Sequence, residues 1–214
     1  MQKQITFFVI SLFICLVAQS QESAKEIYSA PNLKDTISKH KIVAILPYTV
    51  SIAYKRPPKN FNADANTEEE KSLAKNLQLE MFTYLLRKRD KYSVEFQDVD
   101  QTNALLRRAG VWDRLEELTA DSLAIILKVD AVIKCNYSYE KTASEGAAIA
   151  KTVLFGGIGS KTASGLLTMQ IKNGSNGILL WRFSKSMNET AFSSASQLME
   201  RMMKKVARNF PYEK

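Results

Sequence analysis

Hydrophobic positions along the chain predict strands of two kinds. Residues Ile42–Leu46 are apolar at every position and end at Pro47, which predicts a central strand covered on both faces. Ala131–Tyr139 instead alternates apolar and polar residues, which predicts a strand with one exposed face. A shorter strand is predicted at Val94–Val99. The sheet is therefore expected to combine a buried strand with half-exposed ones.

A hairpin is predicted near the C-terminal end of the sheet. Residues 173–177 (NGSNG) favour a tight turn, because glycine and asparagine tolerate positive φ. The residues on either side alternate, with apolar side chains at Leu167, Met169 and Ile171 before the turn and at Leu179, Trp181 and Phe183 after it. We expect Trp181 to face the core together with Leu179 and Phe183.

Helical spacing of apolar residues predicts the first long helix. The capping box Thr67-Glu68-Glu69-Glu70 is expected to begin it, and the basic run Arg87–Arg89 is expected to end it. The preceding stretch Ser51–Asn66 contains Pro57-Pro58, which predicts a long loop.

Three further helices are predicted from caps and apolar faces. Asp100 is expected to cap one that ends at Gly110, and Thr119–Ser122 is expected to begin the next. A capping box at Ser194–Gln197 begins the last, whose apolar stripe is Ala195, Leu198, Met199, Met202, Val206 and Phe210.

The predicted order of elements is β-α-β-α-α-β-β-β-α. Helices precede the early strands and an antiparallel hairpin follows, so we expect a mixed sheet of about five strands with helices packed on it. This is an α/β (α+β) fold in a single domain spanning residues 41–214, and residues 21–40 are predicted to be a polar linker.

Residues 1–20 have the pattern of a secretory signal peptide. A basic start is followed by the 14-residue uncharged run Ile5–Ala18, which is shorter than the about 20 residues of a membrane-spanning helix. Ala18 and Ser20 are the small residues at the cleavage flank, so the mature chain is expected to begin at Gln21. An uncleaved membrane anchor is one alternative.

A lipoprotein is the other alternative, and it would use Cys15. Bulky residues precede this cysteine and the apolar run continues after it, so Cys15 is assigned to the signal core and outer-membrane lipidation is disfavoured. Removal of the signal leaves Cys135 alone, which excludes an intramolecular disulfide. Cys135 is expected to be buried as a small hydrophobic residue. The predicted location is periplasmic or secreted.

Composition excludes several classes of function. The 214 residues include a single histidine, His40, and two cysteines, so a histidine triad or a cysteine–histidine metal site is not expected. The formal net charge is +8, but the basic residues lie largely at predicted helix ends without interleaved aromatic residues. Nucleic acid is therefore not expected as a partner.

Two stretches invite a catalytic or cofactor interpretation. Residues 156–162 (GGIGSKT) resemble a phosphate-binding loop, but their glycine and lysine spacing does not match it, so no cofactor is predicted. Asp98 and Asp100 flank a strand end and could serve a hydrolase. A helix cap explains these acids more simply, so no catalytic or metal-binding residue is predicted.

The segment Gly146–Gly165 is the candidate interaction surface. It is apolar, rich in glycine, free of acids, and longer than a hairpin connection requires. It forms either a flap packed on the sheet or a surface that docks on a partner chain or membrane. The residues proposed for that surface are Ile149, Val153, Leu154, Phe155 and Ile158.

The layout resembles a group of bacterial envelope proteins. The group includes the N-terminal domain of TolB, the curli-secretion lipoprotein, the penicillin-binding-protein activator lipoprotein and a family of uncharacterised bacterial lipoproteins. The resemblance rests on Ile42–Pro47, on the junction Leu127–Ile133 and on Gly177–Trp181. At the junction the group usually has a glycine where this chain has Val129.

This resemblance implies a non-enzymatic role in envelope assembly. We expect an exported accessory component that acts through protein–protein contacts with an envelope protein. Homo-oligomerisation and membrane association are left open. The alternatives are a membrane-associated or pore-forming secretion subunit that inserts part of Gly146–Gly165, and a hydrolase that uses Asp98 and Asp100.

Overall fold

The computed structural model describes residues 25–141, 163–189 and 195–214. The strands are β1 (Glu26–Ser29), β2 (Ile42–Ile45), β3 (Thr49–Tyr54), β4 (Glu95–Phe96), β5 (Ala131–Lys141), β6 (Ala163–Asn173) and β7 (Leu179–Glu189). The helices are α2 (Leu33–Ile37), α3 (Ala63–Arg87), α4 (Val99–Arg108), α5 (Ala120–Leu127) and α7 (Ala195–Val206), with short 3-10 turns η1 (Arg89–Lys91), η2 (Trp112–Glu117) and η3 (Ala207–Asn209).

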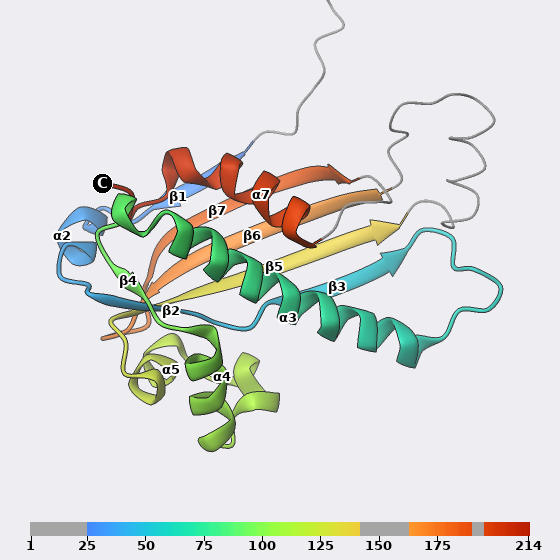
Figure 1. The fold of residues 1–214 in the computed structure, drawn as a ribbon, viewed down its shortest axis with the longest axis horizontal. Coiled ribbons are helices and arrows are strands. Elements are labelled where there is room, and N and C mark those ends of the chain that lie inside the picture. The colour runs from blue at the N-terminus through green and yellow to red at the C-terminus, as the bar shows by residue number, and fades with distance from the viewer. Residues whose placement is uncertain (1–24, 142–162, 190–194) are drawn as a thin grey trace, which may run out of the picture.

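The strands form one mixed sheet in the order β1-β7-β6-β5-β2-β4, and β3 also pairs with β5 (Figure 1). The pairs β2–β4, β2–β5 and β3–β5 are parallel, whereas β6 pairs antiparallel with β5 and with β7. This seven-stranded sheet confirms the predicted α/β class with helices packed on a mixed sheet. It has two more strands than the about five that the hydrophobic pattern predicts.

Strands β2 and β3 follow each other along the same side of β5. Val43 of β2 pairs with Ala131 of β5, and Thr49 of β3 pairs with Asn136 of β5. Between them the Leu46 amide still donates to the Ile133 carbonyl at 3.0 Å. Pro47 has no amide hydrogen, so it interrupts the ladder at this point.

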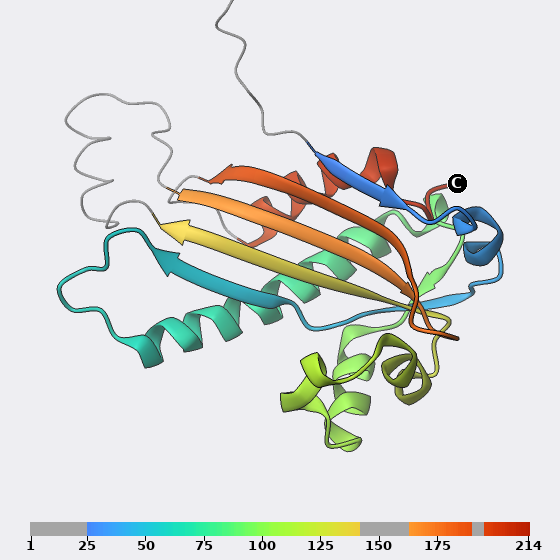
Figure 2. The ribbon, with the colours of Figure 1, turned by 180° about the vertical axis from the view of Figure 1, so that it is seen from behind.

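Helices cover the two faces of the sheet unequally. Successive strand residues point to opposite faces, so Val43 and Ile45 pack toward α3 and α7 while Ala44 and Leu46 pack toward α4 and α5. Figure 1 shows α3 and α7 crossing the front face, and Figure 2 shows the long strands from the other side, with α4 and α5 gathered near β2. The predicted burial of both faces of β2 is confirmed.

The predicted hairpin and its inward-facing tryptophan are confirmed. Trp181 and Phe183 are buried in the same core as Ile133. The prediction for Leu179 is wrong, because a bulge between Ile171 and Lys172 shifts the register. Leu180 takes the buried place instead.

The prediction for Ser51–Asn66 is wrong at both ends. Strand β3 occupies its beginning, and α3 starts at Ala63, with Asn62 as the cap whose side chain accepts a hydrogen bond from the Ala65 amide. Thr67 therefore lies inside the helix and donates to the Ala63 carbonyl. Asn62 is the better cap because residues 63–66 (ADAN) extend the helix by one turn before Thr67.

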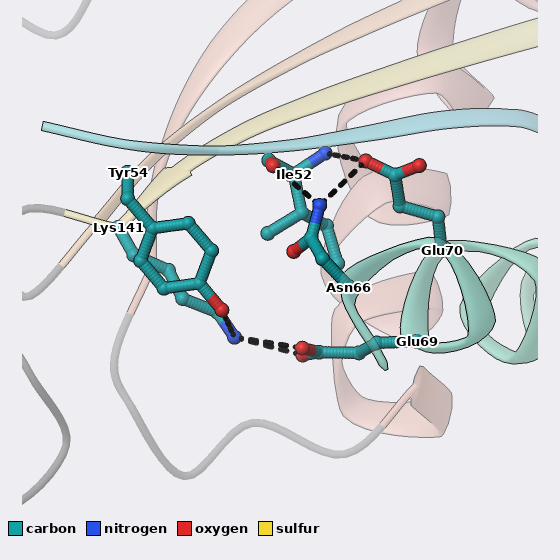
Figure 3. Close-up of polar contacts among 6 residues, drawn as sticks. All are labelled: Ile52, Tyr54, Asn66, Glu69, Glu70 and Lys141. Atoms are coloured by element: carbon teal, nitrogen blue, oxygen red, sulfur yellow. Dashed lines mark hydrogen bonds and ion pairs between the residues drawn. The ribbon is translucent and has the colours of Figure 1, made fainter. Parts of the chain in front are cut away.

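Helix α3 holds strand β3 through side chains (Figure 3). The Ile52 amide donates to Glu70 at 2.7 Å, and Asn66 donates to the Ile52 carbonyl at 3.1 Å. Lys141 of β5 donates to both carboxylate oxygens of Glu69 and to Tyr54. Helix side chains thus satisfy the backbone of a strand that pairs only with β5 among the described residues.

The cap of α4 is Asp98, not Asp100 as predicted. The Asp98 side chain accepts hydrogen bonds from the amides of Asp100 and Gln101 at 2.9 and 3.1 Å. Helix α4 also takes Val99 from the predicted strand Val94–Val99, of which only β4 pairs with a neighbour. The helix predicted to begin at Thr119–Ser122 is confirmed as α5.

The stretch predicted as a polar linker contributes to the sheet. Strand β1 pairs antiparallel with β7 from Glu26 to Ser29, and α2 follows it. The signal cleavage flank at Ala18, Ser20 and Gln21 lies outside the described residues. The same holds for the candidate surface residues Ile149, Val153, Leu154, Phe155 and Ile158.

Candidate functional site

A cleft of about 740 Å³ opens where β2 ends, and we call it the β2 cleft. The chain continues from β2 into β3, passes through α3 on one face of the sheet to β4, and returns through α4 and α5 on the other face to β5. Ligands of open α/β sheets bind at such switch points, outside the carboxyl ends of parallel strands. The volume lies within the range of about 300–1,000 Å³ typical of ligand sites.

The floor of the β2 cleft is apolar. It is contributed by the end of β2, by η2 and α5, and by the start of β5, and its side chains are Leu46, Leu115, Leu118, Leu123 and Val132. Residues separated by more than eighty positions thus meet on one surface. An apolar group entering the cleft would lose contact with water over this floor.

Two buried amides close the inner end of the cleft. Gln78 of α3 donates to the Ile45 carbonyl at 2.8 Å and to Asn103 of α4 at 3.1 Å, and Asn103 donates back to Gln78 at 3.0 Å. Buried amides are costly unless they are hydrogen-bonded, and these two bind each other and the strand end. They therefore fix the spacing of α3 and α4 across the cleft.

Charged residues ring the cleft, and one ion pair in the rim joins η2 to β5. Lys134 lies 2.8 Å from Glu116, which also accepts a hydrogen bond from Thr49 at 2.7 Å. The hydrogen bonds from Lys134 and Thr49 lower the pKa of Glu116. Glu116 is consequently a structural carboxylate and lacks the raised pKa of a general acid.

Arg107 and Trp112 form a flat, cationic wall of the cleft. The Arg107 guanidinium lies over the Trp112 ring, 4.0 Å from its centroid. This stacking holds a long side chain against η2 while its N–H groups keep their hydrogen-bonding capacity.

Asp98 and Asp100, the residues of the hydrolase alternative, have different positions in the structure. Asp98 is engaged as the α4 cap, which confirms the simpler interpretation of this acid. Asp100 lines the β2 cleft.

Cys135 is buried, as predicted. It has no exposed surface, and burial raises the pKa of its thiol to about 12, against a lowering effect of a hydrogen bond with Tyr48. A thiol held in the neutral form is a poor nucleophile. Cys135 therefore acts as core packing.

His40 is also buried, in a polar network. Its Nε2 lies 3.3 Å from Asn173 Oδ1, which can only accept, so Nε2 carries the hydrogen. In the neutral ring Nδ1 then accepts from the Tyr212 hydroxyl at 2.8 Å. Burial lowers the pKa of His40, against the raising effects of the Asn173 hydrogen bond and of Asp130. The network ties the C-terminal segment to the sheet.

Lys141 is held by Glu69 and Tyr54. Burial acts to lower the pKa of Lys141, but hydrogen bonds to Glu69 and Tyr54 outweigh it and raise the pKa. Across residues 25–141, 163–189 and 195–214, no cluster of His, Cys, Asp and Glu is placed to hold a metal ion. No helix in those ranges combines the length and the apolar character needed to cross a bilayer.

Comparisons with known proteins give structural likenesses only. No protein-family model matches the chain, and no curated protein matches it. Similar solved structures include the lipoprotein GNA1162 from Neisseria meningitidis, with a TM-score of 0.40 and 12% identity over 78% of this chain and 94% of that one. The PelC dodecamer from Paraburkholderia phytofirmans has a TM-score of 0.40 and 11% identity over 90% of this chain and 100% of that one.

The C-terminal domain of LpoB from Escherichia coli is also similar, with a TM-score of 0.34 and 13% identity over 74% of this chain and 94% of that one. Bacterial lipoproteins are thus among the structures that this chain resembles. Likenesses of this strength assign no function to the chain.

Proposed function

We propose that the chain is an exported, non-catalytic accessory component of the bacterial cell envelope that acts through protein–protein contacts. The β2 cleft is the surface that receives the partner. One observation carries this proposal: the cleft joins an apolar floor to a charged rim, and its buried amides Gln78 and Asn103 bind each other. An apolar anchor surrounded by polar contacts is the usual composition of a protein-binding surface.

Both amides and one acid of the cleft are engaged in contacts within the chain, which supports binding rather than turnover. Gln78 and Asn103 are engaged with each other, and Glu116 with Lys134 and Thr49. A general base needs a free, suitably placed lone pair and a pKa near the working pH. These groups offer structure and charge for recognition.

Photochemical cross-linking in the bacterium that produces the protein tests this proposal. The photoreactive amino acid benzoylphenylalanine would replace Leu118 in the cleft floor and, as a control, Leu166, which is exposed on β6. We expect a discrete cross-linked protein from position 118 only, and its loss when Leu115→Gln makes the floor polar. Equal cross-linking from both positions, or indifference to Leu115→Gln, would refute the assignment.

Export is part of the same proposal. We expect the mature chain to begin at Gln21, after removal of the segment that ends in Ala18-Gln19-Ser20. N-terminal sequencing and intact mass of protein extracted from the envelope decide this. A chain that starts at Met1, or at a lipidated Cys15, contradicts it.

A further inference from the structure

We infer that the β2 cleft recognises an acidic group on an apolar segment of the partner protein, and that Lys75 and Arg107 bind this acidic group. The inference rests on the proposed function, because it names the chemistry of the partner at the same cleft. Some charged residues that line the cleft have partners within the chain, and others do not.

Three acids of the cleft have their negative charge stabilised within the chain, by hydrogen bonds, an ion pair or a helix dipole. Glu116 is held by Lys134 and Thr49. The Thr119 hydroxyl and the backbone amides of Asp121 and Ser122 lower the pKa of Asp121. Asp100 lies in the first turn of α4, where the helix dipole stabilises a negative charge.

The same holds for the charges near the start of α3. Glu68, hydrogen-bonded at 2.8 Å, and Asp113 both raise the pKa of Lys71. Lys71 therefore has Glu68 as its ion-pair partner within the chain.

Three cations of the cleft are left over: Lys75, Arg107 and Lys172. Within the described part of the chain, none of the three pairs with a carboxylate at ion-pair distance. Arg107 lies on the Trp112 ring, which orients the guanidinium without neutralising it. A guanidinium in this state offers paired N–H donors that match a carboxylate.

Helix spacing places two of these cations, Lys75 and Arg107, next to the hydrogen-bonded amides Gln78 and Asn103. Lys75 lies one turn before Gln78 on α3, and Arg107 lies one turn after Asn103 on α4. Because Gln78 and Asn103 are hydrogen-bonded, the two helices are held together at that level. Both cations line the cleft above the apolar floor.

The charge distribution favours a protein segment over a lipid surface. The cleft is lined by five cations (Lys71, Lys75, Arg107, Lys134 and Lys172) and four acids (Asp100, Asp113, Glu116 and Asp121). An anionic membrane attracts clusters of basic residues, and each acid in such a cluster would oppose it. A mixed pattern around an apolar floor instead suits a partner with its own pattern of charge.

Two dyes with the same rings test the chemistry of the cleft directly. Anilinonaphthalene sulfonate carries an anionic group, and N-phenyl-1-naphthylamine lacks it. We expect the double variant Lys75→Gln/Arg107→Gln to weaken binding of the anionic dye about tenfold or more, because two charge-assisted contacts are lost. Binding of the neutral dye should stay within about twofold.

A matched control removes the same two charges elsewhere. Arg56 and Lys59 are exposed in the loop between β3 and α3, so Arg56→Gln/Lys59→Gln lowers the net charge equally without touching the cleft. This control should leave both dyes bound as before. Equal weakening of the anionic dye by the two double variants would overturn the inference, since it would reflect net charge alone.

The floor variant separates this inference from the proposed function. Leu115→Gln should weaken both dyes and should abolish the cross-link at position 118. If Leu115→Gln has these effects while Lys75→Gln/Arg107→Gln spares the anionic dye and the cross-link, the cleft binds a partner but the inferred acidic group is wrong. If Leu115→Gln affects neither dye, the cleft is not the binding surface and the proposed function fails.

A vesicle assay addresses the lipid alternative. Co-sedimentation would be measured with vesicles of phosphatidylglycerol and phosphatidylethanolamine. We expect no binding that depends on Lys75 and Arg107. Vesicle binding that both substitutions remove would overturn the inference in favour of a lipid ligand.

Discussion

Replacing Trp181 with alanine should remove the largest side chain of the main core. Trp181 is 1% exposed, and its ring centroid lies 6.0 Å from those of Phe183 and Phe210. A buried tryptophan truncated to alanine typically costs about 3–5 kcal/mol, because the apolar contacts are lost and the cavity only partly closes. That is a large part of the about 5–15 kcal/mol that stabilises a domain.

Urea unfolding followed by circular dichroism measures this cost. The expected loss corresponds to a decrease in Tm of about 6–20 °C at this chain length. Trp181→Phe keeps an aromatic ring and should lose less, so it remains measurable if the alanine variant does not fold. Leu166→Ala, at a position 43% exposed on the same hairpin, should change stability by only about 0.5 kcal/mol. A cost for Trp181→Ala no larger than that of Leu166→Ala would refute the assignment of Trp181 to the core.

Three further changes test local contacts. Burial lowers the pKa of His40 from 6.5, so as the pH falls the unfolded chain protonates this imidazole before the folded protein does. Stability should therefore fall as the pH is lowered below 6.5, and His40→Gln should flatten the pH dependence of the urea midpoint. Asp98→Ala should cost about 1 kcal/mol in urea unfolding through loss of the α4 cap. Gly174→Ala should lower the Tm by the equivalent of about 1–3 kcal/mol, because a Cβ there would lie 2.6 Å from the Asp130 carbonyl oxygen and 2.8 Å from Ala124.

The sequence predicts those parts of the fold in which the apolar pattern is long or complete. Ile42–Leu46 is apolar throughout because helices cover both faces of β2, and the α7 stripe is unbroken because one face packs on the core. Because such a pattern reflects which faces are buried, it predicts the position of the strand or helix along the chain.

The two strands that the sequence did not predict, β1 and β3, bury few side chains. All four residues of β1 are exposed, and it is held by backbone pairing with β7. Strand β3 buries Ile52 and is held by Glu70 and Asn66 of α3. Their stability comes from partners far along the chain or on another element, which a local pattern does not show.

The candidate cleft could not be predicted for a related reason. Its residues come from the end of β2, from α3, α4, η2 and α5, and from β5 and β6, and no short motif contains them. Trp112 gave a partial signal, because an aromatic residue following Arg107, Arg108 and Gly110 stands out in a polar stretch. The Gln78–Asn103 bridge gave none, since amides are common on exposed helix faces as well.

The position of the cleft follows from one break in the sheet. Pro47 ends β2, and β3 continues the pairing along β5. Beside β2, strand β5 is buried on both faces from Ala131 to Ile133. Beside β3, one face of β5 is uncovered, and Asn136 and Ser138 are exposed. Helices α4 and α5 cover only the part of β5 that lies beside β2. The cleft lies where this coverage ends and α3 passes the end of β2. The apolar floor of the cleft belongs to the core between the sheet and helices α4 and α5, whereas Lys75, Arg107 and Lys172 have no ion-pair partner among the described residues. Such an edge of the core beneath free positive charge is a surface suited to an amphipathic partner.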